Sequence, residues 1–103
     1  MSEQWIKLLD DPEIWKPFFP HVFYVKSKHL IAVKGKLQWH VFDEACPHNG
    51  AKLSKGFFNA DETLVCPLHR YRFNLMDGRA LSGGCALHLY KTQLRQNALF
   101  VSV

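Results

Sequence analysis

The sequence predicts an all-β domain, and three observations support this prediction. Short apolar or alternating runs dominate the chain, turn residues separate these runs, and no long stretch shows a helical period. The 103 residues suit one compact domain and leave no room for two, so we expect residues 1–103 to form a single unit. Because 48% of the residues are apolar, the chain has enough material for a packed core.

Four strands are expected in the first half of the chain. They are Trp5–Leu8, Val22–Val25, Leu30–Val33 and Leu37–Phe42. Three prolines interrupt the segment between the first two strands, so at most a helical turn forms near Asp11–Trp15. Gly35 lies between the third and fourth runs and favours a hairpin turn there.

Four further strands are expected in the second half. They are Leu64–Val65, Tyr71–Asn74, Leu87–Gln93 and Leu99–Val103. The dipeptide Asp77-Gly78 is a strong turn signal, and residues 95–97 are suited to close the last hairpin. Two loops, at about residues 44–55 and 64–73, then lie beside the strands. Loops held by a rigid sheet commonly carry binding groups.

The charge and the hydropathy argue against several classes of function. The formal charge of +4 comes from 13 Lys and Arg against 9 Asp and Glu that are scattered along the chain, so we do not expect nucleic-acid binding. No run approaches the length of a membrane-spanning helix, so no membrane partner is expected. The N-terminus has no basic start followed by an apolar segment, which argues against a signal peptide and predicts a cytoplasmic protein with reduced cysteines.

Each of the two loops contains one cysteine and one histidine. The pattern is Cys46-x-His48, then seventeen residues, then Cys66-x-x-His69. Two thiolates and two imidazoles are able to close a zinc site, although structural zinc sites usually pair cysteine with cysteine at short spacing. A catalytic cysteine–histidine pair would need only one of the loops. A [2Fe–2S] centre explains the duplication if one iron takes both cysteines and the other takes both histidines.

The two loops resemble the Rieske iron–sulfur signature. The stretches CPHNGAKLSKG (residues 46–56) and CPLHRYRFNLMDGRAL (residues 66–81) are similar to the two cluster loops of Rieske ferredoxins, and the resemblance covers nearly the whole chain. It implies an antiparallel β-sandwich with a small cluster-binding subdomain of two loops. It also implies one [2Fe–2S] cluster, with Cys46 and Cys66 on the inner iron and His48 and His69 on the outer iron.

The residues around the ligands indicate the low-potential branch of this family. Two neutral imidazoles make the site less negative than four thiolates would, which raises the potential of Rieske centres in general. High-potential respiratory Rieske proteins add a disulfide, whose positions here are Ala51 and Leu68. They also place a serine and a tyrosine where this chain has Tyr71 and Phe73. We therefore expect the type associated with oxygenases.

The resemblance implies a one-electron carrier that takes electrons from a flavoprotein reductase and passes them to a terminal oxygenase. The sequence shows no nucleophile, base or mononuclear iron triad, so we expect an electron-transfer component of a multi-component oxidoreductase system and not an enzyme. The alternative is a small Rieske subunit of a multi-component reductase such as nitrite reductase. A zinc-stapled interaction module ranks third.

Several positions in and near the loops leave alternatives open. Rieske proteins usually have glycine after the second histidine, where this chain has Arg70, so the backbone there either avoids positive φ or Arg70 tolerates the strain. Gly50 is expected at positive φ. Cys85 is expected to be a small packing residue, with a reactive thiol as the alternative. Four cations flank the loops, as a docking patch or as solvated charges: Lys52, Lys55, Arg70 and Arg72.

Overall fold

The computed structural model describes residues 4–47, 50–68, 70–82 and 84–103. The described residues form short strands and two single-turn 3₁₀ helices, as the sequence predicted for an all-β protein. The elements are β1 (Trp5–Asp10), η1 (Pro12–Ile14), β2 (His21–Val25), β3 (Lys28–Lys34), β4 (Trp39–Asp43), η2 (Leu53–Lys55), β5 (Phe57–Phe58), β6 (Thr63–Val65), β7 (Arg72–Asn74), β8 (Thr92–Arg95) and β9 (Ala98–Ser102). Within the described part of the chain, no helix is both long and apolar enough to cross a membrane.

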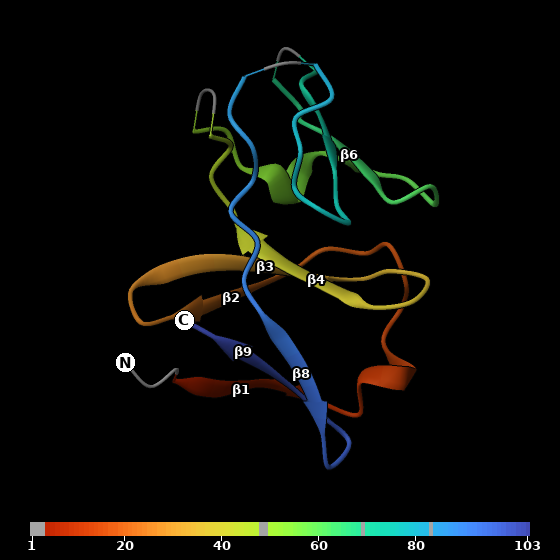
Figure 1. The fold of residues 1–103 in the computed structure, drawn as a ribbon, viewed down its shortest axis with the longest axis vertical. Helices are drawn as coiled ribbons and strands as arrows, with labels where there is room; N and C mark the ends of the chain where they lie inside the picture. Colours follow the sequence, from red (N-terminus) through yellow and green to blue (C-terminus); the bar gives the residue numbers. More distant parts are fainter. Residues whose placement is uncertain (1–3, 48–49, 69, 83) are drawn as a thin grey trace.

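Strands β1–β4, β8 and β9 form the part of the molecule that we call the base. Two three-stranded antiparallel sheets, β1-β9-β8 and β2-β3-β4, lie one above the other (Figure 1). Buried side chains from both sheets fill the space between them, and we call this cluster the lower core. Its members are Leu9, Leu30, Ala32, Trp39, Val41, Leu99 and Val101.

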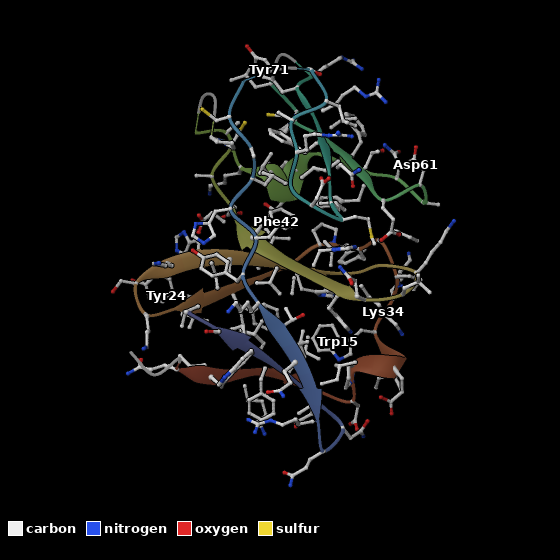
Figure 2. All side chains as sticks on the ribbon, in the orientation of Figure 1. Trp15, Tyr24, Lys34, Phe42, Asp61 and Tyr71 are labelled. Carbon is white, nitrogen blue, oxygen red and sulfur yellow. The ribbon has the colours of Figure 1, made fainter. Side chains whose placement is uncertain are left out.

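The described residues between Glu44 and His88 form a second part of the molecule, which we call the tip. A third antiparallel sheet, β5-β6-β7, stands above the base together with η2 and the loops (Figure 1). A second cluster of buried side chains, the upper core, joins the tip to the base, and Figure 2 shows Phe42 at this junction. The upper core consists of Ile31, Val33, Phe42, Cys46, Leu53, Leu64, Cys66, Phe73, Leu75 and Leu87.

The sheet β2-β3-β4 contributes to both cores, because successive side chains of a strand point to opposite faces. On β3, Leu30 and Ala32 belong to the lower core, whereas Ile31 and Val33 belong to the upper core. All four side chains are fully buried. A strand covered on both faces reads as a continuous apolar run, which is why LIAV lacks the polar alternation of a half-exposed strand.

The turns that the sequence predicted are present. The Gly35 N–H donates to the Gln38 carbonyl at 2.9 Å and closes the β3–β4 hairpin. Gly78 has a φ of 78° and donates its N–H to the Asn74 carbonyl at 2.7 Å. Residues 96 and 97 both have positive φ between β8 and β9, as a two-residue hairpin turn requires. The helical turn expected before β2 is η1.

Two strand predictions need correction. Of the predicted strand Leu87–Gln93, only the end lies in β8 (Thr92–Arg95), because the segment changes its partner as it descends from the tip to the base. Leu89 forms a single bridge with Phe42, and the Tyr90 N–H donates to a β4 carbonyl. Strand β5 was not predicted, because two residues are too short to carry a periodic pattern.

Candidate metal centre

The first Cys-Pro loop is closed at its base by backbone hydrogen bonds. Ala45 and Lys52 form an antiparallel bridge, and the Cys46 N–H donates to the Ala51 carbonyl at 2.8 Å. Within the loop, the Gly50 N–H donates to the Cys46 carbonyl at 2.8 Å. Gly50 has a φ of 74°, as predicted, and this left-handed turn brings the chain back to its own start.

The second Cys-Pro loop is closed in the same way. The Cys66 N–H donates to the Tyr71 carbonyl at 2.7 Å, so each cysteine bonds to the carbonyl five residues later. Arg70 occupies the place that Gly50 has in the first loop, four residues after the cysteine, and its φ is 57°. The structure thus decides between the two alternatives for Arg70, which adopts the left-handed conformation at a cost of about 1 kcal/mol.

The two cysteines lie in the upper core. Their exposed fractions are 3% for Cys46 and 0% for Cys66, and both belong to one apolar cluster with leucine and phenylalanine side chains. Among the described residues, all three cysteines are thiols and not disulfides. Two buried sulfur donors from loops with the same closing hydrogen bond are suited to hold one metal centre between the loops.

The predicted histidine ligands, His48 and His69, lie outside the described residues. Their assignment stays a prediction. Of the neighbouring positions, Tyr71 is half-buried against the upper core, and Phe73 is a fully buried member of it. Leu68 is exposed to 47%.

Glu44 supports the first loop and was not found by sequence reasoning. Its carboxylate is buried and accepts a hydrogen bond from the Ser54 hydroxyl at 2.6 Å. The Glu44 backbone donates to the His29 carbonyl at 2.9 Å and accepts from the Leu53 N–H at 2.8 Å. Glu44 therefore joins β3, the first loop and η2. A single glutamate before a cysteine is not a motif, so the sequence did not predict this role.

A pair of buried polar side chains, also missed, fastens the tip to the base. His40 on β4 lies with its Nε2 atom 2.7 Å from Glu62 Oε1, and the side chains are 1% and 12% exposed. The Lys36 N–H donates to the other Glu62 oxygen at 3.2 Å. A Cβ at Gly35 would lie 2.6 Å from His40 Nε2, so the hairpin glycine leaves room for this pair.

A groove of about 630 Å³ runs beside the first loop. Cys46, Pro47, Lys52 and Lys28 are among its lining residues. Its Tyr90 hydroxyl donates to a carboxylate oxygen at 2.7 Å, and burial together with this hydrogen bond raises the tyrosine pKa. The groove exposes one flank of the cysteine loop to solvent and contributes no further ligand cluster among the described residues.

Cys85 corrects a prediction. It was expected to pack as a small residue, but its side chain is exposed between Gly84, which has a φ of 94°, and Ala86. The loop that follows β7 is tied down before this point, because the Leu81 N–H donates to the Arg72 carbonyl at 2.7 Å. The cysteine thus lies in the exposed part of the loop.

Comparisons with known proteins agree with the resemblance seen in the sequence. A family model described as Rieske [2Fe-2S] domain matches residues 4–91. The ferredoxin component of the naphthalene 1,2-dioxygenase system of Pseudomonas aeruginosa is 35% identical over 81 residues, which are 79% of this chain and 76% of that protein.

Solved structures show the same fold. The ferredoxin of carbazole 1,9a-dioxygenase from Nocardioides aromaticivorans IC177 aligns with a TM-score of 0.81 at 24% identity, over 94% of this chain and 95% of that chain. A chain from a complex of reduced oxygenase and oxidised ferredoxin in carbazole 1,9a-dioxygenase aligns with a TM-score of 0.80 at 23% identity, over 95% and 92%. The predicted all-β sandwich with a subdomain of two loops is therefore confirmed.

Proposed function

The chain belongs to the Rieske [2Fe-2S] domain family, and on that premise we propose that it carries single electrons from a reductase to a terminal oxygenase. Residues 1–103 act as one domain in this proposal. Cys46 and Cys66 bind the inner iron of the cluster, and His48 and His69 bind the outer iron. The observation that carries the proposal is the pair of buried thiols on two loops with the same backbone closure.

The donor set fits the cofactor of this family. Both cysteines are thiols in the upper core, and thiolate sulfur is the ligand that iron–sulfur clusters require. A zinc-stapled module would need the same four side chains around one ion, but the family to which the chain belongs holds a [2Fe–2S] cluster. When bound, that cluster supplies one-electron oxidation and reduction, with iron alternating between the ferric and ferrous states.

The protein's own residues position the ligands and exclude water. Leu53, Leu64 and Leu87 belong to the same buried apolar cluster as the two cysteines, which restricts solvent access and lowers the local polarity. Pro47 and Pro67 fix φ directly after each cysteine, so the loops reorganise little when the charge changes. With no serine hydroxyl at the Tyr71 position, we expect a low potential of the oxygenase-associated type.

Relatives support the choice of partners. The naphthalene relative is named as a component of a dioxygenase system, and a carbazole dioxygenase ferredoxin has been solved in complex with its oxygenase. We propose a flavoprotein reductase as donor and a terminal oxygenase as acceptor. The chain then acts as an electron-transfer component and not as an enzyme, and works in the cytoplasm, where cellular reductants keep the exposed Cys85 reduced.

An anaerobic preparation tests this function. Iron and acid-labile sulfide are measured, and visible and electron paramagnetic resonance spectra are recorded before and after dithionite. We expect two irons and two sulfides per chain, a spectrum that bleaches on reduction, and a paramagnetic signal only in the reduced state. Colourless protein with one zinc ion would contradict the proposal. Co-purification with a stable large subunit would favour the reductase-subunit alternative over a transient carrier.

A further inference from the structure

The net positive charge of the chain is concentrated around the cysteine loops. Three segments that border the proposed cluster, residues 45–56, 66–72 and 80–88, contain four Lys and Arg residues and no Asp or Glu. The remaining chain contains nine cations and nine carboxylates. The whole formal charge of +4 is therefore found in these three segments, which corrects the expectation that the excess charge is scattered along the chain.

The cations of the tip are exposed, and the nearby carboxylates accept hydrogen bonds from uncharged hydroxyl groups. Lys52, Lys55 and Arg70 are exposed and form no ion pair with a described residue. Beside the first loop, Glu44 accepts from Ser54, and Asp43 accepts from Tyr90. Both carboxylates keep their negative charge on the groove side of the first loop, and neither forms an ion pair with Lys52 or Lys55.

Of the other acidic residues of the tip, Glu62 contacts His40 of the base, and Asp61 lies apart from the end of the tip. Figure 2 shows Tyr71 at the end of the tip farthest from the base and Asp61 on its side. Asp61 accepts from the Thr63 hydroxyl, which lowers the pKa of its carboxyl group, and Arg72 adds a weaker electrostatic contribution. The negative charge of Asp61 thus partly offsets the positive charge of Arg72, whereas no ion pair with a described residue offsets the charge of Arg70.

The same two loops also expose apolar side chains. Pro47 and Leu68 are exposed, one in each loop directly after or near the cysteine. An apolar centre with a charged rim is the usual composition of a transient protein interface. A rim of one sign selects a partner of the opposite sign and accelerates encounter.

Among these exposed cations, Arg70 has an unusual backbone conformation. It holds the left-handed conformation that Gly50 adopts at the matching place of the first loop. Glycine would fill this position without strain, whereas arginine brings a positive charge to it at a conformational cost. Because Arg70 follows the proposed ligand His69, that charge is placed at the edge where an electron would leave.

We propose that Lys52, Lys55 and Arg70 form a basic docking rim for an acidic surface of the redox partner, with Arg70 as the specificity-determining contact. The inference rests on the proposed function and adds the chemistry of the partner to it. In the transfer itself, one electron leaves the reduced protein and reduces one ferric centre of the partner. The rim takes no part in bond making and acts on encounter and orientation.

Variants at Arg70 test the inference, with Lys26 as the matched control. Lys26 is also an exposed cation at positive φ (48°), but it lies in the β2–β3 turn of the base. Arg70→Gln removes the charge, Arg70→Lys keeps it, and Arg70→Gly also relieves the backbone. Lys26→Gln and Lys26→Gly make the same changes in a turn of the base.

Binding of the oxidised protein to an acidic probe, cytochrome b5, and a basic probe, cytochrome c, is measured by calorimetry from about 20 to about 200 mM salt. We expect preference for the acidic probe, weakened by salt. Arg70→Gln should reduce that affinity about threefold to tenfold at low salt, with Arg70→Lys and both Lys26 variants within about twofold of the wild type. Arg70→Gly should raise the melting temperature while losing affinity.

Two results would overturn the inference. One is equal binding of both probes, and the other is an equal effect of Arg70→Gln and Lys26→Gln. Iron, sulfide and the reduced-state resonance signal are measured for every variant. A protein that holds its cluster but shows no preference for the acidic probe refutes only the docking rim. A protein that never assembles a cluster refutes the proposed function itself.

Discussion

The base and the tip of this protein are stabilised in different ways. The base has strands of four to seven residues in two paired sheets, and its lower core contains only apolar side chains and one tryptophan. The tip has strands of two or three residues, and its core includes the thiols Cys46 and Cys66. Short ladders and reactive groups are poor sources of stability on their own. We infer that the base is the scaffold and that the tip depends on its cofactor.

Loss of a cysteine ligand is expected to have the largest effect and to separate the two regions. Cys66→Ala should abolish cluster binding and increase amide hydrogen exchange throughout residues 44–88, because metal binding and local folding are coupled. Strands β1 and β9 should keep their protection. Cys85→Ala, which changes an exposed thiol, is the control and should retain the cluster. An equal increase of hydrogen exchange in the base and the tip of Cys66→Ala would contradict the inference that only the tip depends on the cofactor.

A matched pair of core substitutions tests the difference between the base and the tip further. Leu64 in the tip and Leu99 in the base are both fully buried, so Leu→Ala at either site should lower the free energy of unfolding by about 3 kcal/mol. Only Leu64→Ala should speed the loss of the cluster, because Leu64 packs in the same core as both cysteines. The checks are chemical denaturation and the decay of visible absorption in air. Similar decay rates for both variants would count against a separate tip.

The attachment of the tip to the base is tested at His40 and Glu62. His40→Ala should lower the free energy of unfolding by about 2 kcal/mol, because it leaves a largely buried carboxylate without its partner. A double-mutant cycle with Glu62→Ala measures the coupling between the two. The exposed pair Lys7–Asp10 of the base is the control, with an expected coupling under about 0.5 kcal/mol. Equal couplings would show that the buried pair has no special role.

The smallest effect is a pH dependence that belongs to the base. Burial against Trp15 and Phe19 lowers the pKa of His21, whose Nε2 atom lacks a hydrogen-bond partner among the described residues. The unfolded chain therefore takes up a proton at His21 first, and stability should fall as the pH drops below about 6.5 until the folded state is protonated too. His21→Phe should flatten this fall in thermal denaturation. An unchanged pH profile would exclude His21 as its source.

The sequence predicted the features that rest on local signals. Apolar runs located most of the strands, and Gly35 and Asp77-Gly78 marked their turns, because each signal lies within a few residues of the structure it sets. The two cysteines were located by their motif, and the structure places both in one core.

Features that depend on contacts between distant residues were not predicted. His40 and Glu62 are 22 residues apart, and neither has a motif. Glu44 meets Ser54 only after the first loop has closed. The sequence did not decide the conformation of Arg70. Its positive φ depends on how the backbone closes the second loop, and the structure shows that Gly50 adopts the same conformation in the first loop.

Pulsed electron paramagnetic resonance on the dithionite-reduced protein is the most direct test of the proposal that His48 and His69 bind the outer iron. The protein is prepared with natural and with nitrogen-15-labelled histidine. We expect strong couplings to two histidine nitrogens, with one of them lost in each of His48→Cys and His69→Cys. A reduced cluster without histidine coupling, or couplings that survive both substitutions, would contradict the assignment of these residues to the outer iron.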